Sequence, residues 1–304
     1  MAIRVVITGA SGLLGRQVLA EAQKREGVDA IGLALTRTEN GLHKLDLTDE
    51  SVVHGFFQNT HPDAIIHCAA ERRPDMAASN PDLAERLNAH VPGLLAREAK
   101  EHDSFIVYVS TDYVFDGRNP PYGVADEPNP LNFYGRTKLA GERQTLRENP
   151  NAAVLRVPLL YGQVEYPGES AVDVLLGPVR DPSKQTKMDD IQDRFPTCVD
   201  DVARVLVDMV QMGVGADNAR MRGIFHVSAE ERMTKYAMSL MFAQILGIDN
   251  TDHLVAVREL PKEDAGSVLR PGDTQMTNQA LEEAGISPSF VPFKQWWTKY
   301  LLKS

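Results

Sequence analysis

The stretch that most constrains this chain is VVITGASGLLG at residues 5–15, where three glycines separate an apolar β-branched run from a helical pattern. Glycine is required where a backbone turns sharply, where it approaches a pyrophosphate and where a helix packs closely on a sheet. The helix N-terminus adds amides that can hold an anion. Gly9, Gly12 and Gly15 therefore predict a dinucleotide-binding turn, with tight packing alone as the alternative. Their spacing is G-x-x-G-x-x-G, which differs from the G-x-G-x-x-G fingerprint.

The first half of the chain alternates short apolar runs with longer segments of helical periodicity. The runs alternate only weakly between apolar and polar residues, which is typical of parallel strands covered on both faces. This rhythm predicts an α/β fold, a Rossmann-type doubly wound parallel sheet. The strand-like runs lie at residues 3–8, 29–35, 64–70, 104–110 and 152–162.

The composition changes near residue 165, where proline, glycine and aspartate become frequent. We therefore predict a nucleotide-binding domain over residues 1–165 and a smaller C-terminal lobe for substrate or partner over residues 166–304. The segment FPTCVDDVARVLVDMV has a helical pattern, and residues 196–228 are expected to return to the first domain.

Composition and charge exclude several classes of protein. The formal net charge is −10, and no long basic block is present, so we do not expect nucleic-acid binding. No apolar run approaches the roughly 20 residues that a membrane helix needs, and the chain enters a strand-like run at once, which predicts a cytoplasmic protein. Cys68 and Cys198 lie in apolar stretches and are expected to be reduced, buried thiols. No metal site is predicted, because no cluster has metal-ligand spacing.

Two residues bear on the choice of cofactor. Arg37 follows the second predicted strand, where many NAD-binding domains carry an acidic residue for the ribose 2′-hydroxyl. A guanidinium can hold a 2′-phosphate with two hydrogen bonds, so NADP(H) is favoured over NAD, with a solvated surface arginine as the alternative. Asp46 follows a short third strand and could meet the adenine amino group.

A second set of polar residues predicts carbonyl chemistry. Thr111 lies where a strand ends, which is the edge of an open α/β sheet where ligands collect. Tyr134 and Lys138 are four residues apart, so on a helix they share one face. Thr111 could hold a carbonyl oxygen, Tyr134 could protonate it, and Lys138 could lower the pKa of the phenol while it holds the nicotinamide ribose. The alternative is a solvated helix face.

These stretches resemble the extended short-chain dehydrogenases/reductases, and the resemblance covers essentially the whole chain. The resemblance rests on four stretches: TGASGLLG, STDYVFDG, YGRTKLAGE and RFPTCVDDVA. Two branches share the wording STDYVFDG and PLNFYGRTKLAGE: the dTDP-4-dehydrorhamnose reductases and the regulatory beta subunits of methionine adenosyltransferase. Four further stretches resemble the beta subunits more closely: HCAAERRPD, AAVLRVPLLYGQVE, MDDIQDRFPT and MTKYAM.

The resemblance also implies roles for individual residues. The catalytic-type set is Thr111, Tyr134 and Lys138. Residues that face the groove toward substrate or partner are Glu71, Arg72, Arg73, Asp112 and Arg194, although a charged loop would also explain the first three. The implied cofactor-binding residues are Gly9, Ser11, Gly12, Leu13, Leu14, Gly15, Arg37, Asp46, Leu47, Cys68, Ala69, Ala70, Tyr134, Lys138 and Pro158.

Two functions follow from the resemblance and remain open at this point. The first is an NADP-binding regulatory subunit that docks on the methionine adenosyltransferase catalytic subunit in S-adenosylmethionine synthesis. The second is an NADPH-dependent reductase of a nucleotide-linked 4-keto sugar. We favour the first, because its distinguishing stretches lie outside the shared cofactor core. The sequence leaves homo-oligomerisation and turnover of any substrate open.

Overall fold

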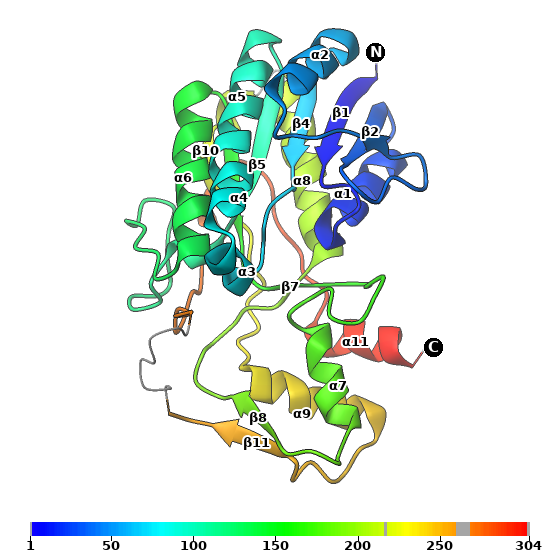
Figure 1. The fold of residues 1–304 in the computed structure, drawn as a ribbon, viewed down its shortest axis with the longest axis vertical. Helices are drawn as coiled ribbons and strands as arrows, with labels where there is room; N and C mark the ends of the chain where they lie inside the picture. The colour runs from blue at the N-terminus through cyan, green and yellow to red at the C-terminus, as the bar shows by residue number, and fades with distance from the viewer. Residues whose placement is uncertain (1, 216–217, 260–267, 303–304) are drawn as a thin grey trace.

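One seven-stranded parallel sheet forms the centre of the molecule (Figure 1). The computed structural model describes residues 2–215, 218–259 and 268–302. The strand order is β10-β6-β5-β4-β1-β2-β3, so the connections change direction between β1 and β4. This is the topological switch point at which ligands bind in such sheets. The predicted doubly wound fold is confirmed. The strands are β1 Ile3–Thr8, β2 Val28–Ala34, β3 His43–Lys44, β4 Ala64–His67, β5 Phe105–Thr111, β6 Ala153–Val157 and β10 Gly223–His226.

Three neighbouring strands on one side of the switch point are buried along their whole length. Every residue of β4, β5 and β6 is buried, as expected of parallel strands with helices on both faces. The apolar run at residues 152–162 is not one strand, however. β6 ends at Val157, and β7 (Leu160–Tyr161) pairs with β9 (Thr197–Cys198) in a separate small sheet. Pro158 lies between them and has no N–H to continue the ladder.

Helices cover both faces of the sheet (Figure 1). On one face α1 (Leu13–Lys24) packs against α8 (Val199–Val214), and Val18 and Val202 join one apolar cluster with the strands. The other face carries α2 (Glu50–Thr60), α5 (Val91–Glu101) and α6 (Phe133–Glu148). Among the described residues, no helix combines the length and the apolar character that crossing a bilayer requires.

The segment at residues 81–102, one of those with helical periodicity, has an irregularity in the middle. α4 (Pro81–Glu85) passes through a π-helical turn, Arg86–His90, before α5 begins. Pro92 has no N–H to offer the carbonyl oxygen of Asn88, and the hydroxyl of Tyr108 donates to that oxygen instead at 2.8 Å. The irregular turn thus places Asn88 beside the end of β4.

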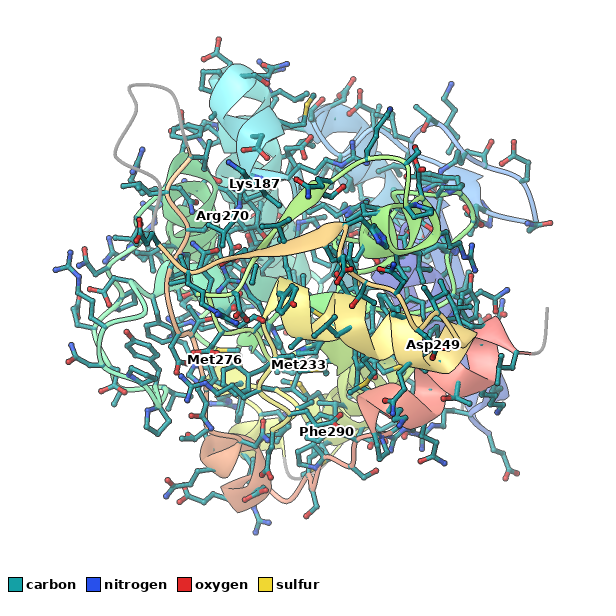
Figure 2. The ribbon with its side chains drawn as sticks, turned by 90° about the horizontal axis from the view of Figure 1, so that it is seen from below. Lys187, Met233, Asp249, Arg270, Met276 and Phe290 are labelled. Atoms are coloured by element: carbon teal, nitrogen blue, oxygen red, sulfur yellow. The ribbon has the colours of Figure 1, made fainter. Side chains whose placement is uncertain are left out.

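The smaller lobe lies below the sheet and has its own core (Figure 1). We use "lobe" for β7, β9 and a second two-stranded sheet, β8 (Thr186–Asp189) with β11 (Leu254–Val257), together with their helices. Trp297 is fully buried there against Tyr161, Phe242 and Phe293. Figure 2 looks up at the lobe and shows α9 and α11 side by side. The lobe helices are α7 Leu176–Arg180, α9 Lys235–Leu246 and α11 Phe293–Leu301.

The chain crosses between sheet and lobe several times. After β6 it enters the lobe, and α8 and β10 then lie in the layers of the sheet. It returns to the lobe for α9 and β11, and α10 (Gln279–Glu283) packs again on the α8 face before α11 closes the lobe. The remaining elements are α3 Pro74–Ser79 and the 3₁₀ turns Asp112–Val114, Asp173–Leu175 and Asn218–Arg220.

Candidate functional site

A cleft of about 870 Å³ lies between the carboxyl edge of the sheet and the lobe. It runs from the glycine turn after β1 to the start of α6. All the residues predicted to bind cofactor line it, as do Thr111, Asp112, Arg72, Arg73 and Arg194. The ends of six strands, β1 to β6, therefore contribute to one cavity, as expected at a switch point.

The glycine turn fits a bound pyrophosphate. Gly9 has φ +65°, and a Cβ there would lie 2.8 Å from the backbone nitrogen of Ala69. A Cβ on Gly15 would lie 2.2 Å from the carbonyl oxygen of Gly9, so α1 can approach the turn only because Gly15 has no side chain. Gly12 is the N-cap of α1 and supplies no side chain to the first-turn amides, which leaves these donors for an anion.

Arg37 lies at the glycine turn, and its donors are engaged there. Its Nη2 donates to the carbonyl oxygen of Ser11 and its Nη1 to the carboxylate of Glu165. One carboxylate oxygen of Asp46 accepts hydrogen bonds from the backbone and the hydroxyl of Thr48, at 2.9 and 2.7 Å. Arg37 is thus more than a solvated surface arginine, and a 2′-phosphate would have to compete for it.

The three residues of the predicted catalytic set lie together at one end of the cleft. Thr111 is the last residue of β5, and Tyr134 lies in the first turn of α6 with Lys138 one turn further on. Asn132 is the N-cap of α6 and accepts a hydrogen bond from the amide of Gly135 at 2.9 Å, which fixes where the helix begins.

Burial shifts the pKa values of two members of this set. Burial raises the pKa of Tyr134, and a hydrogen bond with Thr111 opposes this shift only in part. The Lys138 ammonium donates to the carbonyl oxygen of Val109 at 2.7 Å and lies 4.1 Å from the ring centre of Tyr108. Burial lowers the pKa of Lys138 to about 7. Burial is thus the largest influence on the pKa of both groups, and a lowering of the phenol pKa by Lys138 stays a prediction.

The loop after β4 is held by a residue that the sequence reasoning missed. Asn88 is fully buried, accepts from the Glu71 amide and donates to the Glu71 carbonyl oxygen, both at 2.9 Å. The Glu71 side chain accepts from the amide of Arg73. Glu71 does not line the cleft, whereas Arg72 and Arg73 do. In the sequence, Asn88 is marked only by its position four residues before Pro92. That spacing indicates a free carbonyl oxygen at Asn88 only once both residues are known to lie in one helical segment.

Arg194 and Asp112 border the cleft from buried positions. Arg194 is 3% exposed and donates to the carbonyl oxygens of Asp193 and Pro271, at 2.8 and 3.0 Å. Burial raises the pKa of Asp112, which accepts a hydrogen bond from the hydroxyl of Thr274. Arg194 thus binds backbone carbonyl oxygens of the lobe through Nη1. The sequence had suggested that this guanidinium would face a substrate or partner instead.

Two further cations line the lobe side of the cleft and were not predicted. They are Lys235, at the start of α9, and Arg270, which Figure 2 labels. Burial lowers the pKa of Lys235, and the charges of Arg270 and Arg194 lower it further. Arg270 also forms an ion pair with Asp75 of α3 at 2.9 Å, which joins the lobe to the sheet domain. Lys235 lies in the stretch MTKYAM, but nothing in that stretch marks it as a cleft residue, and the lobe brings both cations to the cleft through its tertiary fold.

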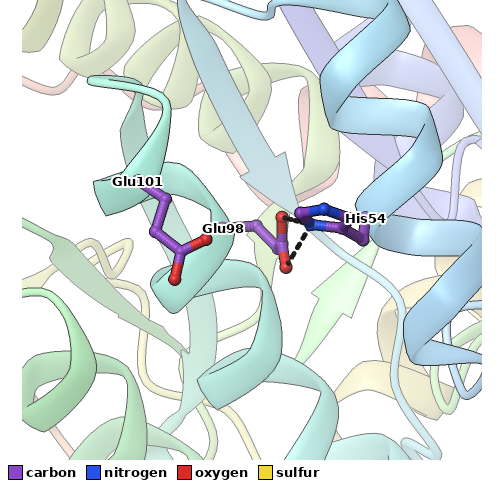
Figure 3. Close-up of side chains that lie close together, drawn as sticks. All are labelled: His54, Glu98 and Glu101. Carbon is purple, nitrogen blue, oxygen red and sulfur yellow. Dashed lines mark hydrogen bonds and ion pairs between the residues drawn. The ribbon is translucent and has the colours of Figure 1, made fainter.

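His54, Glu98 and Glu101 form a cluster away from the cleft (Figure 3). Their donor atoms lie within 4.8 Å of one another, between α2 and the C-terminal half of α5. Nδ1 of His54 is 3.0 Å from a carboxylate oxygen of buried Glu98, so two of the three donors already bind each other. None of the three residues lines the cleft.

A doubly wound sheet with a glycine turn, a Tyr-x-x-x-Lys pair at its carboxyl edge and a smaller lobe across the cleft defines an extended short-chain dehydrogenase/reductase. The chain belongs to the RmlD substrate binding domain family, which matches residues 3–299.

Known relatives fall into both branches that the sequence suggested. The chain is 46% identical over 291 residues to methionine adenosyltransferase 2 subunit beta of Danio rerio, covering 96% of this chain and 88% of that one. It is 33% identical over 293 residues to the dTDP-4-dehydrorhamnose reductase of Mycolicibacterium smegmatis, covering 95% and 82%. The crystal structure of dTDP-4-dehydrorhamnose reductase from Bacillus anthracis in complex with NADP has the same fold, with a TM-score of 0.84, 24% identity and coverage of 100% and 99%.

Proposed function

We propose that this chain is an NADP(H)-binding regulatory subunit that docks on a methionine adenosyltransferase in the cytoplasm. One observation carries the proposal: the chain is 46% identical to a methionine adenosyltransferase beta subunit over 96% of its own length, against 33% for a reductase. Both comparisons span sheet and lobe. The two free cysteines, Cys68 and Cys198, agree with a reducing compartment.

The proposed cofactor role rests on the shape and donors of the cleft. Gly9 and Gly15 leave space that a Cβ would fill, and the first turn of α1 presents amides. Arg37 lies beside the turn, where a ribose 2′-phosphate would meet it. A ligand that binds only the folded chain also stabilises it, so a rise in melting temperature with NADP⁺ is expected.

Docking is tested by mixing the purified chain with a methionine adenosyltransferase catalytic subunit. Multi-angle light scattering should show a heteromer, and the rate of S-adenosylmethionine formation should respond to the added chain. The same mixture with and without NADP⁺ separates a structural effect of the nucleotide from docking itself. Two separate peaks together with unchanged synthetase kinetics would count decisively against the proposal.

A second function is favoured by a specific observation: the reductase-type set lies in the same cleft as a group of cations. Thr111, Tyr134 and Lys138 line one part, while Arg72, Arg73, Lys235 and Arg270 line another. Such cations could hold the phosphates of a nucleotide-linked 4-keto sugar. NADPH would supply the hydride to the keto carbon, and Tyr134 would donate the proton to its oxygen.

The reductase alternative is tested by following oxidation of NADPH with a dTDP-4-keto sugar. Turnover should be lost in Tyr134→Phe, which keeps the ring but removes the proton donor. Binding of NADP⁺ to Tyr134→Phe, measured by calorimetry, is the control for folding. If no sugar nucleotide supports consumption of NADPH by the unaltered chain, the reductase alternative fails, and the docking proposal stands on its own test.

A further inference from the structure

The arginine that would hold a 2′-phosphate is already paired with a carboxylate from the loop that follows β7. Arg37 donates through Nη1 to Glu165 and through Nη2 to the carbonyl oxygen of Ser11. The ring of Tyr166 lies 5.7 Å from the Arg37 guanidinium carbon. Both terminal nitrogens of the guanidinium are therefore engaged, and these are nitrogens that would bind a phosphate in a two-pronged manner.

A neighbouring ion pair holds the acidic segment in this position. Arg16 of α1 donates to both carboxylate oxygens of Glu169, at 2.7 and 2.9 Å, and to the Ser11 carbonyl oxygen at 3.0 Å. The carboxylate of Glu169 in turn accepts the amide of Glu165 at 2.8 Å. The Glu169 side chain is 1% exposed and that of Glu165 is 46% exposed. Glu169 is thus a buried anchor, whereas Glu165 is half exposed, and its carboxylate lies 3.3 Å from Nη1 of Arg16 as well as against Arg37.

We propose that Glu165 acts as an internal competitor for the ribose 2′-phosphate and thereby lowers the preference of the cleft for NADP(H) over NAD(H). The inference rests on the proposed dinucleotide binding and adds a residue that sets its specificity. A 2′-phosphate is an anion that would bind the same guanidinium nitrogens as the carboxylate, so it must displace Glu165 from Arg37. A 2′-hydroxyl carries no charge to compete and leaves the Arg37–Glu165 pair in place.

The size of the effect follows from the exposure of the pair. Arg37 and Glu165 are 39% and 46% exposed, so breaking the pair alone costs little, because solvent screens it. If Glu165 stayed nearby it would also repel the phosphate, since like charges at close range disfavour each other. Removing the charge of Glu165 should therefore tighten NADP⁺ binding by about threefold to tenfold, with tenfold corresponding to about 1.4 kcal/mol.

The test compares Glu165→Gln with the unaltered chain in calorimetric titrations with NADP⁺ and with NAD⁺. The dissociation constant for NADP⁺ should fall by about threefold to tenfold, while that for NAD⁺ should change by less than about twofold. Glu39→Gln is the matched control, because it removes the same charge from an exposed residue two positions from Arg37. This control should leave both constants unchanged, which separates the specific contact from a change in overall charge.

The other outcomes are informative in different ways. Equal or weaker NADP⁺ binding by Glu165→Gln, with the unaltered chain binding NADP⁺, overturns the competitor role and leaves the proposed cofactor intact. Equal tightening by Glu165→Gln and Glu39→Gln also overturns it, because the effect would then come from net charge. If neither protein binds either dinucleotide, the proposed cofactor function fails and the competitor role fails with it.

Discussion

Lys138 lines the cleft but is buried. Its neighbours offset only part of the free energy that its ammonium group loses on leaving water. Its contacts are the Val109 carbonyl oxygen and the ring of Tyr108, and burial lowers its pKa from 10.5 to about 7. The unfolded chain therefore binds this proton more tightly than the folded protein does. Between pH 7 and 10.5, unfolding takes up a proton, so the contribution of Lys138 makes stability rise with pH across that window.

We predict that Lys138→Met removes this pH dependence. In the unaltered chain the contribution to the free energy of unfolding should be on the order of 1–2 kcal/mol between pH 7 and 8.5. Urea unfolding at several pH values in this range measures it as the difference between the two proteins. Lys44→Met, at an exposed position, is the control and should follow the unaltered chain. Parallel curves for all three proteins would show that Lys138 keeps its ordinary affinity for a proton.

Single residues also show which properties of the site could be predicted from the sequence and which could not. The sequence was sufficient to predict that four residues would lie in one cleft, because parallel strands end at one edge of a sheet. They are Gly9, Thr111, Tyr134 and Lys138. The pKa shifts could not be predicted, since they depend on burial and on partners such as Val109. Contacts across the cleft, such as Arg270 with Asp75, join residues almost 200 positions apart and have no local signature.

At the scale of elements, two helical glycines have opposite roles. A Cβ on Gly15 would lie 2.2 Å from the Gly9 carbonyl oxygen, whereas a Cβ on Gly55 of α2 would meet nothing within 4 Å. Gly15→Ala should lower the free energy of unfolding by about 1–3 kcal/mol and weaken NADP⁺ binding, because α1 must move off the turn. Gly55→Ala should instead raise stability by about 0.5–1 kcal/mol. Denaturant titrations measure both, and a stabilising Gly15→Ala would contradict the packing described for the turn.

The helix that carries Tyr134 and Lys138 is tied to the sheet by a buried ion pair. Arg156 of β6 donates to both oxygens of Glu142 on α6, at 2.9 and 2.7 Å, and Ser110 also donates to this carboxylate. The two charged side chains are only 1% and 2% exposed.

Glu142→Gln should lower the free energy of unfolding by about 3–5 kcal/mol, because it leaves the buried charge of Arg156 without its counter-ion. The control is Glu148→Gln at the pair with Arg147, whose side chains are 28% and 71% exposed and where a loss below about 1 kcal/mol is expected. Equilibrium unfolding in urea compares the two variants. Equal losses at both positions would contradict the role given to the buried pair.

Sequence patterns located most elements and failed where tertiary contacts decide. β1 begins and ends at the predicted residues, since burial on both faces produces an unmistakable apolar run. The run at 152–162 is divided because Pro158 ends the ladder of β6. The segment 81–102 contains a π-helical turn because Tyr108, from β5, takes the place of the N–H that Pro92 lacks. The division at Pro158 could have been predicted from the sequence, because proline ends a ladder. The π-helical turn could not, because it depends on Tyr108 of the neighbouring strand.

For the whole molecule, the interleaved path of the chain joins sheet and lobe. Both tryptophans of the protein, Trp296 and Trp297, lie in α11 of the lobe. Tryptophan fluorescence therefore reports the lobe, while far-ultraviolet circular dichroism is dominated by the sheet and its helices. Because the chain passes repeatedly between the two parts, we predict that both signals change at the same urea concentration. A fluorescence transition at clearly lower urea would show that the lobe unfolds independently.

The central claim is that the cleft between sheet and lobe holds NADP(H), with the pyrophosphate at the glycine turn and the nicotinamide toward Tyr134. A crystal structure of the chain grown with NADP⁺ tests it most directly. The account predicts electron density for the pyrophosphate beside Gly12 and Leu13, for the 2′-phosphate beside Arg37, and for the nicotinamide ribose beside Lys138. Density for the dinucleotide elsewhere, or a cleft without it at saturating NADP⁺, would contradict the account.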